Sequence, residues 1–66
     1  MPNDRTPAVE LLTIAEAAGW LKISITGMRR LQQQRLVPFF KVGGSIRFSK
    51  NDITSYLESR RVEAIG

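Results

Sequence analysis

The sequence contains neither cysteine nor histidine among its 66 residues. Without cysteine the chain forms no disulfide and no thiolate–metal bond, and without histidine it lacks the commonest metal ligand and general base. Its six acidic residues are scattered along the chain, with no pair that the sequence places in a shared cleft. No glycine-rich phosphate-binding loop precedes a predicted helix. We therefore expect that the protein is not an enzyme and has no catalytic residues, no cofactor and no metal site.

Long apolar runs are also missing. No stretch approaches the roughly 20 apolar residues that a membrane-spanning helix needs, and the first residues lack the basic-then-apolar order of a signal peptide. We therefore expect a cytoplasmic protein with no membrane partner. The 42% hydrophobic and 24% charged content favours a folded domain over a disordered chain. We place one domain at residues 11–61, between a flexible N-terminal arm at 1–10 and a C-terminal tail at 62–66.

Acidic residues are absent from the centre of the chain. Residues 24–50 carry six cations and no acid, whereas the segments on either side each carry a net charge of −1. The six cations are Arg29, Arg30, Arg35, Lys41, Arg47 and Lys50. Positive charge confined to one stretch is the electrostatic footprint of a surface that meets phosphates. The charge pattern by itself leaves two alternatives open: an anionic partner, or a small basic domain that binds nothing acidic.

A first helix is predicted by its cap and its apolar spacing. Thr13 and Glu16 have the spacing of a capping box, in which the side chain of each residue accepts a hydrogen bond from the backbone amide of the other. Behind the cap, apolar residues at i, i+3, i+4 and i+7 form one inward face: Ile14, Ala17, Ala18 and Leu21. A tight turn follows, and we expect Ile23 of this turn to fill part of the core.

A second helix is predicted to begin after Ser24, which is a good N-cap. Met28 and Leu31 lie on its inner side by helical spacing, and the helix must end before Pro38 because the residue before a proline is pushed out of the α region. The same spacing turns four polar residues outward: Thr26, Arg29, Arg30 and Gln33.

A β-hairpin is predicted around the two glycines at 43–44, which separate two runs of β-branched and aromatic residues. Alternation places Phe40 and Val42 on one face of the first strand and Phe39 and Lys41 on the other. Phe39 then points outward, where it would mark a partner surface. We expect four aromatic side chains in the core rather than on a base-stacking surface: Trp20, Phe40, Phe48 and Tyr56.

A third helix is predicted from a second cap, because Ser49 and Asp52 repeat the N-cap and N3 arrangement. Ile53, Tyr56 and Leu57 form its inward stripe. The order of elements predicts an α+β fold that is mainly α: a small winged helix-turn-helix with a helix-turn-helix, a two-stranded β-hairpin wing and a C-terminal helix.

The chain resembles the excisionase-type DNA-binding domains. These small winged-helix proteins are related to the DNA-binding head of MerR-type regulators, and they include phage and transposon excisionases and AlpA-like prophage regulators. The resemblance covers roughly residues 11–57 and is carried by an ordered set of short motifs. They are LLTIAEAA at 11–18, LKIS at 21–24, RL at 30–31, VP at 37–38, KVGG at 41–44, RF at 47–48 and DI at 52–53.

The resemblance implies that the second helix enters the major groove of double-stranded DNA and that the wing lies on the backbone or in the adjacent minor groove. It implies an excisionase (a recombination directionality factor) or a prophage-type transcription regulator. The partners would be an integrase or recombinase, or further copies of the chain on DNA, and we expect no small-molecule ligand. The alternative is a protein-interaction module that uses the winged helix to bind a recombinase or transcription partner.

Two residues depart from the family pattern. Gly27 stands where the family usually has Thr or Ser, which removes a base-facing hydroxyl or lets the helix backbone approach DNA or the first helix. Arg35 stands where the family usually has a left-handed glycine that closes the second helix. Keeping that conformation costs an arginine about 1–2 kcal/mol, and the alternative is a helix that runs one residue further.

Eight residues are the candidate DNA contacts: Ser24, Thr26, Arg29, Arg30, Gln33, Lys41, Ser45 and Arg47. Arg29 suits the guanine acceptors and Gln33 suits the adenine edge. Thr26 lies in the first helical turn, where backbone amides attract phosphate, and Ser24 is first of all a cap. For Arg30, a phosphate contact and an ion pair with Glu16 are both open.

In the wing, three residues surround the glycine turn and form the candidate backbone or minor-groove contact: Lys41, Ser45 and Arg47. Glycine at the tip supplies exposed amides without bulk. An ordinary hairpin also needs these glycines for positive φ, so the glycines alone do not distinguish a DNA-contacting wing from an ordinary hairpin. The basic residues on both strands, with no acid between them, favour the DNA contact.

Overall fold

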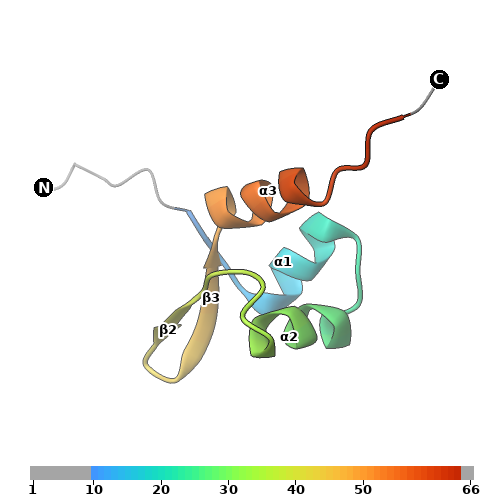
Figure 1. The fold of residues 1–66 in the computed structure, drawn as a ribbon. Helices are drawn as coiled ribbons and strands as arrows, with labels where there is room; N and C mark the ends of the chain where they lie inside the picture. Colours follow the sequence, from blue (N-terminus) through green and yellow to red (C-terminus); the bar gives the residue numbers. More distant parts are fainter. Residues whose placement is uncertain (1–9, 65–66) are drawn as a thin grey trace, which may run out of the picture.

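The computed structural model of the protein describes residues 10–64 and contains three helices and three strands within that range. In chain order they are β1 (Leu11–Leu12), α1 (Ile14–Leu21), α2 (Ile25–Gln33), β2 (Phe40–Val42), β3 (Ser45–Ser49) and α3 (Lys50–Ser59). The β2–β3 hairpin and α2 lie at the lower side of the molecule, and α3 lies across the top (Figure 1). The predicted winged helix-turn-helix fold is confirmed.

All three predicted N-caps are present. Thr13 Oγ1 accepts from the amide of Glu16 at 3.1 Å, and Glu16 Oε1 accepts from the amide of Thr13 at 2.9 Å, which completes the capping box. Ser24 Oγ caps α2 by accepting from the amide of Gly27 at 3.0 Å. Ser49 does the same for α3. Each cap satisfies an amide that has no partner inside its helix, and each fixes where the helix begins.

The two helices of the helix-turn-helix both end on a cationic residue in a left-handed conformation. Lys22 after α1 has φ 59° and Arg35 after α2 has φ 58°. At the second end the amide of Leu36 binds the carbonyl of Leu31, and the amide of Arg35 binds that of Gln32, both at 3.0 Å. This is the Schellman pattern that usually has glycine at the left-handed position. Arg35 therefore keeps the geometry of the family's glycine, and α2 does not run further.

The sheet has three antiparallel strands in the order β1–β3–β2. The glycines at 43–44 both have positive φ, as a two-residue hairpin turn of type I′ requires. The register sets Lys41 opposite Ile46, with Phe40 opposite Arg47 and Val42 opposite Ser45. β1, which the sequence did not predict as a strand, pairs Leu12 with Phe48 and adds a third strand to the predicted two-stranded wing.

The core gathers side chains from every element except β2: Leu12, Ala17, Ala18, Met28, Val37, Phe48 and Ile53. The predicted inner face of α1 is confirmed, and the two buried alanines let α2 pack closely. Tyr56 packs on the core as predicted. Four other expected core residues are largely exposed, namely Trp20, Ile23, Phe40 and Leu57.

The first strand of the hairpin presents the opposite face to the core from the one predicted. Phe39 packs against the core from the loop before β2, whereas Phe40 is 46% exposed. The alternation rule failed because it was extended through residue 39, which precedes the strand, and because β2 is an edge strand with no buried residue. Phe39 therefore packs inward and anchors the wing, contrary to the predicted outward orientation.

Of the predicted N-terminal arm, residues 1–9 lie outside the described residues. The carbonyl of Glu10 accepts from the amide of Lys50 at 2.8 Å, beside the β1–β3 pairing. Of the predicted tail, residues 62–64 follow α3 without regular structure, and 65–66 lie outside the described residues.

Candidate nucleic-acid interface

The outer side of α2 presents the four polar side chains that helical spacing predicted. Thr26, Arg29, Arg30 and Gln33 are all exposed, whereas Met28 on the opposite side is fully buried. Consecutive helical residues point about 100° apart, so Arg29 and Arg30 diverge to the two flanks of the helix, with Thr26 and Gln33 between them. Ser24 precedes this face, and its hydroxyl is committed to the cap.

Arg29 meets the wing in a hollow of about 340 Å³. This wing–helix hollow is lined by the start of α1, by α2 and by β3: Thr13, Ile14, Ala15, Ile25, Arg29, Ser45, Ile46 and Arg47. Arg47 is half-buried, and its Nη1 donates to the carbonyl of Ile46 at 2.9 Å. One guanidinium donor holds the side chain on its strand, while the other four remain available to a ligand. Three of the eight candidate residues thus converge: Arg29, Ser45 and Arg47.

Lys41 lies apart from this group. The register pairs Lys41 with Ile46 and Arg47 with Phe40, so the two cations project from opposite faces of the hairpin. Lys41 lines a second hollow of about 490 Å³ with Arg35, Val37, Pro38 and Phe39. Arg35 was not among the predicted contacts. The position of Arg35 in the acid-free stretch could have identified it as a candidate contact. In the sequence analysis, however, Arg35 was considered only for its left-handed backbone conformation.

Lys50 belongs to neither hollow. Its Nζ lies 3.4 Å from Glu10 Oε1 and 4.5 Å from the centre of the Trp20 ring. Helical spacing places Trp20 off the inner face of α1, so its ring lies at the surface, where Lys50 makes the cation–π contact. The acid-free stretch of the sequence is therefore neutralised at one end by an acid 40 residues away.

Arg30 forms no ion pair with Glu16 in residues 10–64; the Glu16 carboxylate instead binds the amide of Thr13. Arg30 lines a third hollow on the flank of α2 away from the wing. The eight predicted residues thus do not form one patch. They divide among the wing–helix hollow, the Lys41 hollow, the exposed ridge of α2 and this third hollow.

Within the described part of the chain, no three histidine, cysteine, aspartate or glutamate side chains gather where they could hold a metal ion. None of the helices in residues 10–64 has the length and apolar character that crossing a membrane requires.

Two helices joined by a tight turn, followed by a hairpin that shares a hollow with the second helix, define a winged helix-turn-helix domain. The chain matches the family described as the helix-turn-helix domain over residues 11–61, and it belongs to that family. Comparison with curated proteins and with solved structures gave no match. Membership of this family indicates DNA as the partner and binding rather than catalysis as the function.

Proposed function

We propose that the protein binds double-stranded DNA sequence-specifically, with α2 in the major groove and the β2–β3 wing on the backbone or in the adjacent minor groove. The observation that carries this proposal is the convergence of Arg29 from α2 with Ser45 and Arg47 from β3 on one hollow. A helix and a wing that present cations to the same side can contact one duplex together. In Figure 1 the hairpin tip and α2 share the lower side of the molecule.

Within this arrangement the contacts differ in kind. Arg29 and Gln33 project from the exposed side of α2, where they would reach base edges. Arg29 would donate to the acceptors of guanine, and the Gln33 amide would pair with the donor and acceptor of adenine. Thr26 and the first amides of α2 suit a phosphate. Lys41, Ser45, Arg47 and the glycine turn provide contacts that position the protein on the backbone. Arg35 adds a cation beside Lys41.

The biological role that we propose is that of an excisionase or a prophage-type transcription regulator. A single module of this size buries roughly 600–1,000 Å² of protein surface on DNA, which limits its specificity. Function would then require several copies on neighbouring sites or a partner such as an integrase or recombinase. Sequencing genomic fragments that the protein retains separates the two roles. Sites beside an integrase attachment core support excision, and promoter sites support regulation.

The salt dependence of duplex binding tests DNA recognition. If four to six phosphates are neutralised, the logarithm of the affinity should fall against the logarithm of salt concentration with a slope of about −4 to −5. Lys41→Ala and Arg47→Ala should each reduce the slope by about one unit and weaken binding to all sequences. A flat salt dependence, or no duplex binding at low salt, would show that the winged helix has another partner.

A further inference from the structure

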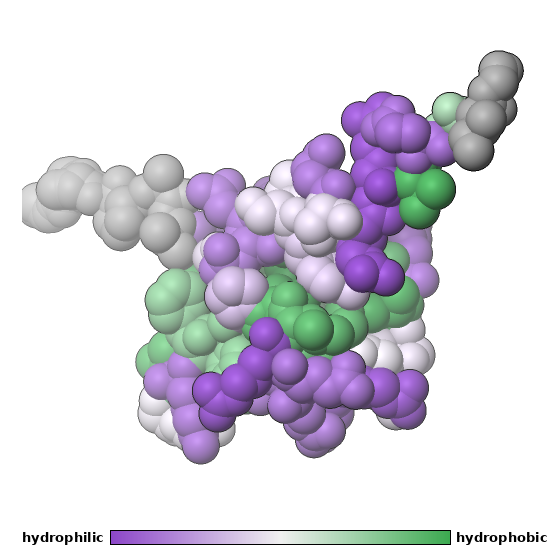
Figure 2. All heavy atoms as spheres, viewed as in Figure 1, coloured by the Kyte–Doolittle hydropathy of each residue, from purple (hydrophilic) through white to green (hydrophobic). Residues whose placement is uncertain are grey.

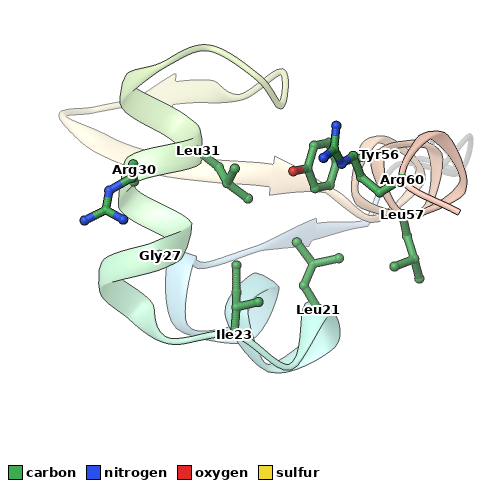
Figure 3. Close-up of a pocket in the computed structure, with 8 residues that line it drawn as sticks. All are labelled: Leu21, Ile23, Gly27, Arg30, Leu31, Tyr56, Leu57 and Arg60. Carbon is green, nitrogen blue, oxygen red and sulfur yellow. The ribbon is translucent and has the colours of Figure 1, made fainter. Parts of the chain in front are cut away.

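The third hollow is an apolar groove between the α1–α2 turn, α2 and α3. It has a volume of about 420 Å³ and is lined by eight residues: Leu21, Ile23, Gly27, Arg30, Leu31, Tyr56, Leu57 and Arg60. Figure 3 shows Leu21 and Ile23 rising from the turn toward Leu31 and Tyr56, with Leu57 and Arg60 on α3. We call this site the arginine-rimmed groove, because its only charged residues are Arg30 and Arg60.

The groove leaves apolar surface open to solvent. Ile23 is 40% exposed and Leu57 is 52% exposed, although both were expected in the core. A hydrophobic band crosses this side of the molecule between the hydrophilic surfaces of α3 and α2 (Figure 2). Gly27 also lines the groove, and a Cβ added there would lie 3.8 Å from the Ile23 side chain, in ordinary van der Waals contact. Apolar surface gathered in a depression with a polar rim is typical of an interaction site.

The groove lies on the flank of α2 away from the wing–helix hollow. Arg29 lines the hollow and Arg30 lines the groove, and no residue is shared between the two sites. Figure 3 shows the Arg30 guanidinium directed away from the apolar side chains, on the outer side of α2. A ligand in the groove therefore leaves Arg29 and the wing free, so the protein can hold DNA and this ligand at the same time.

Charge determines which ligand the groove suits. No acidic residue lines it, and the ion pairs recorded among residues 10–64 join Lys50 to Glu10 and Arg61 to Glu63, not Arg30 or Arg60 to a carboxylate. A second copy of the chain, with its net charge of +4, would bring cations toward cations. A segment with apolar side chains flanked by carboxylates would match the apolar floor of the groove and the two arginines at its edge.

We propose that the arginine-rimmed groove docks an acidic amphipathic helix of another protein. Leucine-like side chains at i, i+3 and i+4 of that helix would occupy the space between Ile23, Leu31 and Leu57, as in other helix-in-groove complexes. Its carboxylates would pair with Arg60, and with Arg30 once that exposed side chain turns toward the groove. The proposal extends beyond DNA binding, since it gives the protein a means of joining a DNA site to a second macromolecule.

Two synthetic peptides test the proposal on the full chain. One carries leucines on one helical face flanked by glutamates, and the other has lysines in place of the glutamates. With ¹⁵N-labelled protein, the acidic peptide should bind about tenfold or more tightly than the basic one. Its chemical-shift changes should centre on the amides of Ile23, Leu31 and Leu57. Equal affinities, or shifts centred on the wing, would overturn the proposal.

Matched variants separate docking from general charge attraction. Leu57→Glu should weaken the acidic peptide by about tenfold or more, whereas Leu36→Glu, the same change at an exposed leucine outside the groove, should leave its affinity within about twofold. Arg60→Gln should weaken the acidic peptide without affecting duplex binding. Equal losses in the two leucine variants would indicate nonspecific attraction. Sedimentation showing a dimer that Leu57→Glu dissociates would assign the groove to a second copy and overturn the proposal.

Discussion

The two flanks of α2 carry neighbouring arginines in different surroundings. Arg29 faces the wing, where Ser45 and Arg47 add polar and cationic groups, and Arg30 borders a groove with an apolar floor. The first setting suits a polyanion bound through hydrogen bonds and charge, and the second suits a ligand that is apolar at its centre and acidic at its edge. The same residue type thus lies in different surroundings because of a rotation of about 100° around the helix.

Both flanks of α2 rest on the same hydrophobic core. Removing the largest side chain of that core should therefore disrupt both surfaces. Phe48 is fully buried, so Phe48→Ala should lower the free energy of unfolding by about 3–5 kcal/mol, a large part of the stability of a domain this small. Urea denaturation followed by circular dichroism measures the loss. Phe40→Ala removes the same ring from an exposed position and should cost at most about 1 kcal/mol. Similar losses in the two variants would contradict the assignment of the core.

The next largest effect separates the two flanks. Arg29→Ala should reduce discrimination between the preferred duplex and its single-base variants by about 1–3 kcal/mol, because the bidentate base contact that we propose for Arg29 would be lost. Fluorescence anisotropy with a set of duplexes measures it. Arg60→Ala removes a cation from the groove side and should leave discrimination unchanged. If Arg29→Ala weakened all duplexes uniformly, Arg29 would be a phosphate contact. If Arg60→Ala had the same effect as Arg29→Ala, the groove would belong to the DNA surface.

The smallest effect tests the left-handed helix ends. Arg35→Gly should raise the free energy of unfolding by about 1 kcal/mol, because glycine adopts positive φ without a Cβ penalty. It should also reduce the salt slope of duplex binding by about one unit, since it removes the cation beside Lys41. Lys22→Gly is the matched control: the same strain is relieved on α1, and the slope should not change. An unchanged slope with Arg35→Gly would remove Arg35 from the interface.

The fold was largely predictable from the sequence because its signals are local. The caps at Thr13, Ser24 and Ser49 each depend on a hydrogen bond across three residues, and the glycine turn depends on two adjacent φ angles. The helical spacing that gave the inner face of α1 also places Trp20 outside that face, whereas the exposure of Ile23 was not predictable in this way. Trp20 contacts Lys50, 30 positions further along the chain, and Ile23 borders a groove whose other wall is α3.

The candidate site was predictable as a set of residues but not as an arrangement. Helical spacing correctly turned Arg29, Arg30 and Gln33 outward. Which hollow each cation lines depends on packing between elements, so the sequence did not separate Arg29 from Arg30 or Lys41 from Arg47. The acid-free stretch also did not show that Lys50 is paired with Glu10, because that contact forms only when β1 lies beside β3.

The edge position of β2 has a consequence for the solubility of the protein. β2 is a short outer strand with unpaired backbone groups along one side, and Phe40 and Val42 are 46% and 56% exposed on it. Such an edge is a template for pairing with another chain, and natural sheets protect it with short strands and lysine. Lys41, between these two apolar residues, is the only charge on the strand. The lysine that we assign to a phosphate therefore also protects the free protein from edge-to-edge aggregation.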